Sequence, residues 1–368
     1  MTGIVAGNNG TILKTTNSGN VWVLNTITSN TLYDVFMIGN TGWVCGQNGY
    51  IAKTTNFGTN WITQTSNTGF TLRSIFFRNI NDGWIVGDSG IVKRSTNSGN
   101  TWVEQNSGIN IDLNCVYFHD TQLGWASGRQ GNLIRTTNGG SNWINSYVAR
   151  ITGEKLFFLN ANTGWLCGWG TFGSYDSTLV KTTNGGLTWL PQASQILADI
   201  LGVYFVNENL GWICCNGGFI YVSTNGGNNW YEQSRPVIMP LHDIMFVDSN
   251  IGWSVGQSGS IVSTTNGGGA IGIKQISNEV PKIYSISQNH PNPFNPKTSI
   301  KIGLKEASHV ELTIYDILGR EIEKLVNQEL NPGYYNVDFN GDNYPSGMYF
   351  YRLETDGFSE TKKMVIVK

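Results

Sequence analysis

Apolar and polar residues alternate in short runs along most of the chain, and turns rich in glycine separate these runs. The run from Tyr50 to Thr55 shows the alternation, and the run from Leu32 to Met37 is dominated by aliphatic and aromatic residues. A period of two with β-branched and aromatic residues between turns is typical of short antiparallel strands. The pattern therefore predicts an all-β protein.

The runs belong to a repeated unit. The segment from Gly42 to Trp61, GWVCGQNGYIAKTTNFGTNW, recurs from Gly83 to Trp102 as GWIVGDSGIVKRSTNSGNTW. The first tryptophan of the unit falls at positions 43, 84, 125, 165, 212 and 253, and a partial copy opens the chain. Each unit has four strand-like pieces, in chain order an L-x-x-V-x-F piece, a G-W piece, an alternating piece and a piece opened by a second tryptophan. Such a unit of about 41 residues is typical of a propeller blade, so we predict a seven-bladed β-propeller over residues 1–269.

The turn between the third and fourth pieces has the pattern T-x-N-x-G-x-x-W. Its asparagine is suited to bind the local backbone, its glycine permits positive φ, and its tryptophan can pack over the turn. At about 25 cal/mol per Å², burial of one such tryptophan contributes roughly 4–6 kcal/mol before entropy is subtracted. We therefore interpret the repeated tryptophans as structural residues and not as a platform for a sugar.

This turn resembles the Asp-box (BNR) repeat of sialidase-type propellers, with asparagine in place of the usual aspartate. Together with the G-W-x-x-G-x-x-G-x-I-x-K-T-T core, the unit most resembles the photosystem II stability and assembly factor family. The resemblance covers about residues 1–270 and implies a seven-bladed propeller. It says little about function, because one fold serves many functions.

The four pieces are not equally frequent. The second and third occur seven times each, and the first and fourth occur six times each. We therefore expect blade one to lack its innermost strand and blade seven its outermost strand. The residues after Met1 also lack the basic and apolar segments of a signal peptide. Both observations lead us to expect a native start upstream of Met1.

After a predicted linker at 270–283, the composition changes. A proline-rich entry, PNPFNP, precedes alternating runs such as Thr298–Leu304 and Val310–Tyr315. About seven short strands in residues 284–368 predict an immunoglobulin-like β-sandwich.

Several motifs of this second domain occur in a familiar order: NPFNP, IYDILGREI, PGYYNVDFNG, SGMYFYRLE and KKMVIVK. The set resembles the type A C-terminal sorting domain of the type IX secretion system. The resemblance implies export through that machinery, with residues 284–368 as the contacting part. It also implies a location outside the cell or on the outer-membrane surface of a Gram-negative bacterium.

Composition narrows the function further. A net charge of -2 disfavours nucleic-acid binding, and a charged fraction of 13% with 46 glycines disfavours helical bundles. Three of the five cysteines, Cys45, Cys167 and Cys214, share one repeat position, which predicts small buried side chains and no disulfide framework. The chain has no apolar run long enough for a transmembrane helix, no G-x-S-x-G, H-E-x-x-H or phosphate-loop motif, and only four histidines. We expect no metal and no cofactor.

Strand direction places the candidate site. If the first strand of each blade runs away from one face, which we call face one, the turns between strands two and three also lie on face one. Related propellers bind ligands where the innermost strands begin, so we predict a ligand site there. A longer blade five adds an aromatic loop on the same face. The candidate binding residues are Tyr33, Asp34, Arg73, Asp88, Arg129, Glu154, Lys155, Trp169, Phe172, Tyr175, Asp176, His242 and Asp243, with Gln47, Asn48, Asn114, Gln130 and Gln257 beside them.

Catalysis has weaker support. A sialidase-like mechanism needs an arginine cluster and a nucleophilic tyrosine, but Arg73 and Arg129 are the only arginines at these positions. A glycosidase needs two carboxylates about 5–9.5 Å apart. Asp34 could pair with Asp243 or Asp88, although Asp34 and Asp243 occupy equivalent repeat positions, as duplication alone would produce. We expect a non-catalytic propeller that binds a protein or glycan; the alternatives are a sialidase-like glycoside hydrolase and an assembly factor for a membrane complex.

Overall fold

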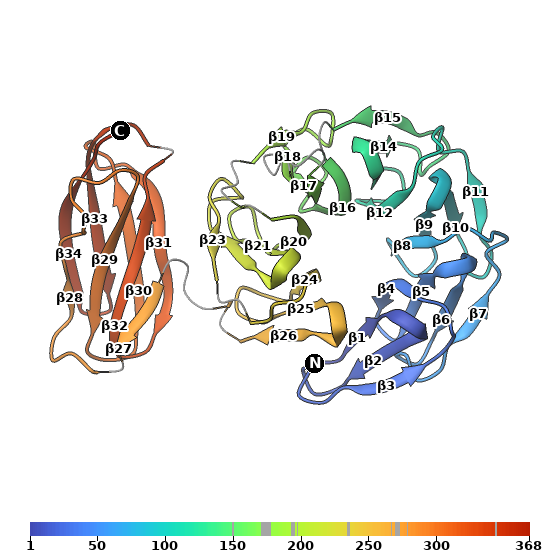
Figure 1. The fold of residues 1–368 in the computed structure, drawn as a ribbon, viewed down its shortest axis with the longest axis horizontal. Coiled ribbons are helices and arrows are strands. Elements are labelled where there is room, and N and C mark those ends of the chain that lie inside the picture. Colours follow the sequence, from blue (N-terminus) through green and yellow to red (C-terminus); the bar gives the residue numbers. More distant parts are fainter. Residues whose placement is uncertain are drawn as a thin grey trace.

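The computed structural model contains two β domains (Figure 1). It describes residues 1–148, 151–170, 178–192, 196, 198–233, 236–265, 267–268, 273–277, 279–342 and 344–368. Strands and short 3₁₀ turns make up the regular elements of these residues. None of the helices in this part of the chain could cross a membrane. The all-β prediction is confirmed.

The first domain is a ring of seven blades (Figure 1). Blade one has β1 (Gly3–Ala6), β2 (Thr11–Thr15) and β3 (Val23–Thr26); blade two has β4 (Leu32–Ile38), β5 (Thr41–Gly46), β6 (Ile51–Thr54) and β7 (Ile62–Gln64). Blade three has β8 (Leu72–Phe77), β9 (Gly83–Gly87), β10 (Val92–Ser95) and β11 (Val103–Gln105); blade four has β12 (Leu113–Phe118), β13 (Gly124–Gly128), β14 (Asn132–Thr136) and β15 (Ile144–Tyr147). Blade five has β16 (Ile151–Phe158), β17 (Gly164–Gly170), β18 (Leu179–Thr182) and β19 (Leu190–Pro191); blade six has β20 (Ile200–Phe205), β21 (Gly211–Cys215), β22 (Ile220–Ser223) and β23 (Tyr231–Glu232). Blade seven has β24 (Leu241–Phe246), β25 (Gly252–Gly256) and β26 (Ile261–Thr264).

Neighbouring strands within each blade are antiparallel, and the first strand of each four-stranded blade lies nearest the centre of the ring (Figure 1). Among the described residues, blades one and seven contain three strands each. Blade one begins with the glycine-flanked strand β1, which is the second piece of the repeat, and blade seven ends with the third piece. The predicted incomplete blades are confirmed.

Adjacent blades are held together by a repeated aromatic contact. The first tryptophan of one blade stacks on a phenylalanine that ends the inner strand of the next blade, as Trp84 does on Phe118, with ring centroids 3.6 Å apart. The second tryptophan of that next blade, here Trp143, meets the same phenylalanine edge-on at 5.8 Å. Trp84 and Phe118 are fully buried, and the turn tryptophan Trp143 is half-buried against the same phenylalanine, so both tryptophans of the unit take part in packing between blades.

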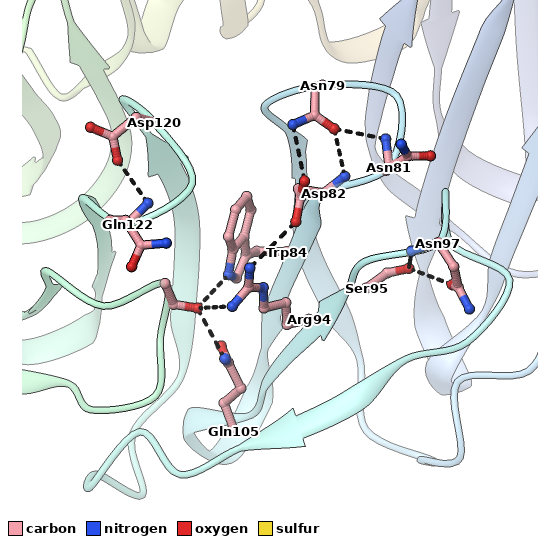
Figure 2. A network of polar contacts seen from close by, with 11 residues as sticks. Asn79, Asn81, Asp82, Trp84, Arg94, Ser95, Asn97, Gln105, Asp120 and Gln122 are labelled. Carbon is pink, nitrogen blue, oxygen red and sulfur yellow. Dashed lines mark hydrogen bonds and ion pairs between the residues drawn. The ribbon is translucent and has the colours of Figure 1, made fainter.

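The tryptophan also donates a hydrogen bond to the repeated turn of the next blade. Figure 2 shows Trp84, Arg94 and Gln105 converging on one acceptor. This acceptor is the carbonyl oxygen of Gly139, which receives the Trp84 indole N–H at 3.1 Å, an Arg94 N–H at 3.3 Å and a Gln105 amide N–H at 3.0 Å. Arg94 also pairs with Asp82 at 3.3 Å. Turn and ring contacts therefore fix the angle between blades.

The second domain is a sandwich of two four-stranded sheets. One sheet has the order β27 (Ile273–Ser277), β32 (Gly333–Asn340), β29 (Lys297–Leu304) and β28 (Ser285–Ile286). The other has the order β31 (Glu321–Leu330), β30 (Ser308–Tyr315), β33 (Gly347–Thr355) and β34 (Phe358–Ile366). β27 falls inside the predicted linker at 270–283, so part of that segment belongs to the sandwich through its pairing with β32.

Candidate functional site

The turns between strands two and three lie beside the starts of the inner strands. The backbone N–H of Asp88 donates to the carbonyl of Thr71 at 2.9 Å, and the N–H of Arg129 donates to the carbonyl of Asp112 at 3.0 Å. Gln47 makes the equivalent bond to Thr31 at 2.9 Å. Both sets of residues therefore share face one, as strand direction predicts.

Each described inner strand, β4, β8, β12, β16, β20 and β24, carries a bulge near its start. In blade two the register shifts between Leu32 and Asp34, and in blade five it shifts between Gly153 and Lys155. A bulge sets two consecutive residues against one residue of the partner strand and re-aims their side chains. This is why pairs of neighbours reach the site, namely Tyr33–Asp34, Arg73–Ser74, Asn114–Cys115, Glu154–Lys155 and His242–Asp243.

Two arginines and two aspartates form an ion-pair network across blades three and four. Arg73 pairs with Asp88 at 2.5 Å and lies 3.9 Å from Asp112, which in turn pairs with Arg129 at 3.3 Å. The guanidinium of Arg73 also lies 5.8 Å from the ring centre of Tyr33. Asp112 was not among the predicted residues, because it comes just before its strand, where the repeat pattern gives no signal.

Glu154 of blade five continues this network. Its carboxylate accepts a hydrogen bond from the Asn114 amide at 3.0 Å. Burial raises the pKa of Glu154 to about 7, and the charges of Arg73 and Arg129 with a hydrogen bond from Trp169 act in the opposite direction. A carboxyl group of this kind can hold or release a proton near neutral pH.

A second charged group lies deeper among the inner strands. The ammonium of Lys155 is 2.8 Å from the carboxylate of Asp243. Burial opposes the charge of Lys155, but Asp243 and Asp34 outweigh burial and raise its pKa. Burial raises the pKa of Asp34, which accepts hydrogen bonds from the Ser74 hydroxyl and the Ile75 N–H at 2.9 Å each. The two aspartates therefore share a lysine counter-ion.

The remaining predicted residues are more scattered. His242 lies beside Asp243, and partial desolvation of its ring lowers its pKa, against the effect of that carboxylate. Gln47 accepts a hydrogen bond from the Thr31 N–H at 3.1 Å, and Asn48 donates one to Asn30 at 2.9 Å, so both support loops. Phe172, Tyr175 and Asp176 lie outside the described residues.

Face one also carries a groove that the sequence did not indicate. It has a volume of about 640 Å³ and runs over blade three between the loops at 67–70 and 104–109, with Ser89 and Gly90 at its floor. Phe70, 51% exposed, is on its wall. Phe70 joins Tyr33 and Trp169, which are 45% and 41% exposed, as aromatic side chains open to solvent on this face.

The described residues offer neither a cluster of metal ligands nor a reactive thiol. No group of three or more potential metal ligands occurs within the residues that the structure describes. All five cysteines are free and buried, and burial raises the pKa of Cys115 to about 11. The thiols therefore act as small apolar side chains at neutral pH.

Two protein families match parts of the chain, one in each domain. Residues 288–367 match the family of the secretion system C-terminal sorting domain, and residues 59–151 match the family of the photosynthesis system II assembly factor YCF48. The chain combines a YCF48-like propeller with a secretion-system sorting domain. No curated protein matches it.

Solved structures agree with this fold. YCF48 from Cyanidioschyzon merolae is 18% identical with a TM-score of 0.60, covering 72% of this chain and 91% of its own. YCF48 bound to D1 peptide gives the same identity and TM-score, covering 88% of its own chain. PorZ, a surface component of the type IX secretion system of Porphyromonas gingivalis, is 12% identical with a TM-score of 0.59; the match covers all of this chain and 58% of PorZ. At these identities the likeness shows the fold alone.

The sorting domain indicates where the chain is sent. Such a domain indicates export by the type IX secretion system to the cell surface or the medium, and it implies contact with that machinery.

Proposed function

We propose that this chain is an exported, non-catalytic binding protein whose propeller holds a protein or glycan on face one. The observation that carries the proposal is the combination of exposed aromatic rings and prearranged charges on that face. Tyr33, Phe70 and Trp169 offer flat surfaces to solvent, and Arg73, Asp112 and Arg129 are fixed by ion pairs. A ligand therefore meets polar groups that need little reordering, which favours affinity.

The charges also argue for recognition over chemistry. Asp34 and Asp243, the strongest candidates for a catalytic carboxylate pair, face a common lysine, and Asp88 is paired with Arg73. An ion pair stabilises the charged form of a carboxylate, which supports a role for these groups in holding a ligand. The same groups suit a ligand that carries hydrogen-bond donors and positive charge.

The test uses the full chain on peptide and glycan arrays, with a parallel readout of hydrolysis. For any ligand found, Tyr33→Ala and Trp169→Ala should each weaken binding by about tenfold or more. Leu187→Ala is the matched control, because Leu187 is 69% exposed in the turn of blade five on the opposite face. Equal loss in the control, or no loss in the two face-one variants, would refute the location of the site.

One observation favours a second candidate, a glycoside hydrolase. Glu154, with a pKa of about 7, has the character of a general acid. The GH74 enzyme of Niastella koreensis, NkGH74, has a similar fold (TM-score 0.60, 13% identity, covering 82% of this chain and 55% of its own). Release of reducing sugar from arrayed glycans, lost in Glu154→Gln, would establish the hydrolase and replace the binding proposal.

We further propose that residues 284–368 direct this chain to the outer-membrane surface of a Gram-negative bacterium. Deletion of these residues in the producing cell should leave the propeller in the periplasm. Surface labelling of intact cells decides the matter, with whole-cell immunoblots to show equal amounts of both forms. Normal surface display of the deleted form would exclude a sorting role.

A further inference from the structure

The groove over blade three lies where other blades place an aromatic side chain of their own. In blade two, Tyr50 follows the turn between strands two and three, and its hydroxyl reaches across to donate to the carbonyl of Ile27 in the preceding loop at 3.4 Å. Phe219 holds the same position in blade six. Blade three has Ile91 there, and its side chain is much shorter than that of tyrosine. One side of the groove is therefore left unfilled.

The opposite side of the groove differs from its neighbour in the same way. In blade four the ring of Tyr147 lies over the turn between strands two and three, 2.8 Å from where a Cβ on Gly131 would be. Asn106 holds the position of Tyr147 in blade three. The resulting groove, of about 640 Å³, has the size of a small-ligand site, for which about 300–1,000 Å³ is usual.

Hydrogen bonds within each loop fix the two walls. In one wall the Ser66 hydroxyl donates to the carbonyl of Thr68 at 3.3 Å, and the Thr68 hydroxyl accepts the N–H of Phe70 at 3.2 Å. In the other wall the Ser107 hydroxyl donates to the carbonyl of Ile109 at 3.1 Å. A ligand that enters the groove therefore has few side chains and loops to order, which favours affinity.

Polar groups in this fixed groove remain available to a ligand. The side-chain oxygen of Asn106 accepts the N–H of Gly108 at 3.0 Å, and its amide N–H groups donate to no other residue that the structure describes. The side chains of Asn67 and Ser89 likewise make no hydrogen bond within the described part of the chain. An amide can donate and accept, so these groups suit a ligand with many hydroxyls.

The charges favour a neutral ligand. Among the described residues that line the groove, Glu104 alone is charged, and its carboxylate pairs with the ammonium of Lys93 at 3.0 Å. The Lys93 side chain is only 3% exposed, so it offers no free cation to an anionic ligand. The lining aliphatic residues, Ile91 and Ile109, are buried and half-buried, so they offer little surface to an apolar anchor of a peptide. A single carboxylate also falls short of the pair that glycoside hydrolysis needs.

We propose that the groove over blade three binds a neutral segment of a glycan. The exposed ring of Phe70 packs against the apolar face of one sugar ring. The amides of Asn67 and Asn106 bond to the sugar hydroxyls, and the Glu104 carboxylate accepts a further hydroxyl. This inference rests on the proposed function, because it places the ligand on face one, and it names the class of ligand and the part of the face that holds it.

The experiment measures binding of hexasaccharides to the full chain by isothermal titration calorimetry. The neutral probes are cellohexaose, mannohexaose, maltohexaose and chitohexaose, and the charged probes are hexagalacturonate and chitosan hexasaccharide. We expect saturable binding of at least one neutral probe, tighter than that of either charged probe. Binding of no neutral probe, or tighter binding of a charged one, overturns the proposal.

Protein variants locate the sugar. Phe70→Ala removes the ring, and Asn106→Tyr fills the groove as Tyr147 does in blade four, so each should weaken binding of the neutral probe at least tenfold. Thr26→Tyr is the matched control, because Thr26 is exposed at the equivalent position of blade one, and it should leave the affinity unchanged. Circular dichroism checks that each variant is folded. If both groove variants bind the probe like the unaltered chain, or if they lose a peptide ligand and no sugar, the proposal is wrong.

Tyr33→Ala and Trp169→Ala distinguish a failure of this inference from a failure of the proposed function. If these two variants lose the neutral probe and the groove variants keep it, the ligand lies among the other aromatic rings of face one and the groove proposal is wrong. If the loss is confined to Phe70→Ala and Asn106→Tyr, the groove proposal holds and the role proposed for Tyr33 and Trp169 is wrong.

Discussion

Trp43 of blade two stacks on Phe77 of blade three, with ring centroids 3.6 Å apart and planes 10° from parallel. The two residues lie on different blades, so their contact depends on the ring and not on either sheet alone. Trp102 meets the same Phe77 edge-on at 5.7 Å. Three further phenylalanines have the same pair of tryptophan contacts, namely Phe118, Phe158 and Phe205. Because each cluster joins two blades, loss of its phenylalanine should destabilise the whole propeller.

Phe118→Ala should lower the free energy of unfolding of the propeller by about 3–5 kcal/mol, because the substitution removes a fully buried ring and leaves a cavity against Trp84 and Trp143. Urea denaturation followed by circular dichroism measures the change. Phe70→Ala is the control, since Phe70 is exposed, and it should change stability by less than about 1 kcal/mol. Comparable losses in the two variants would contradict the structural role of the stack.

The hydrogen bonds of the turn asparagines predict that two substitutions of Asn56 differ in their effect on stability. The Asn56 side-chain oxygen accepts the Asn60 N–H at 2.9 Å and the Thr54 hydroxyl at 3.0 Å. Asn56→Asp keeps an oxygen acceptor for both bonds and should leave the melting temperature within a few degrees. Asn56→Leu removes the acceptor and should cost about 1–2 kcal/mol. Thermal melts compare the two, and a larger loss from aspartate than from leucine would contradict this account of the turn.

The sequence predicts the blades well because each blade repeats the same local rules. A glycine before the tryptophan admits the phenylalanine ring, and the asparagine of the turn closes on its own backbone, so the signals recur in every unit. The bulges leave no such mark, because an extra residue such as Tyr33 between Leu32 and Asp34 changes neither composition nor period. The sequence could therefore place the starts of the inner strands on face one without showing that neighbours there reach the site together.

The repeat pattern in the sequence also did not predict contacts between distant blades. The reach of Lys155 to Asp243 links residues 88 positions apart and depends on the diameter of the ring. Asp34 and Asp243 are equivalent in the repeat, as expected, but the structure adds Lys155 as a counter-ion for both carboxylates.

Glu154 predicts a pH-dependent stability. Its pKa in the folded chain is about 7, above the ordinary value of 4.5, so the unfolded chain releases this proton at lower pH. The stability associated with protonated Glu154 is therefore full below about pH 4.5 and is lost as the pH rises through 7. Glu154→Gln should raise the free energy of unfolding at pH 8 by about 1–3 kcal/mol and change it little at pH 4.5.

Glu279→Gln is the control for this experiment, because Glu279 is exposed between β27 and β28 of the sandwich. This substitution should change the free energy of unfolding by the same small amount at pH 4.5 and at pH 8. If the free energy of unfolding of Glu154→Gln differs from that of the unaltered chain by the same amount at both pH values, the carboxyl group does not titrate as proposed.

A buried carboxylate of the sandwich makes contact with the propeller. Glu323 of β31, 6% exposed, accepts a hydrogen bond from the Tyr231 hydroxyl of β23 at 2.6 Å and one from the Tyr344 hydroxyl at 2.7 Å. Burial raises the pKa of Glu323, and the two hydroxyl donors oppose that rise. Tyr231 belongs to the propeller, whereas Glu323 and Tyr344 belong to the sandwich, so one hydroxyl links the domains.

Tyr231→Phe should loosen this link in a pH-dependent way. When Glu323 is ionised, Tyr231→Phe removes one of its two donors, and a hydrogen bond to a charged group contributes about 1.5–3 kcal/mol. Below pH 4.5 the protonated carboxyl group is less dependent on the donor, so the loss should be smaller. Small-angle X-ray scattering should show a larger radius of gyration for Tyr231→Phe at pH 8 than at pH 4.5, with both domains still folded by circular dichroism. Tyr334→Phe, a change within the sandwich alone, should leave the radius unchanged, and a Tyr231→Phe variant that matches it at both pH values would remove Glu323 as the link between the domains.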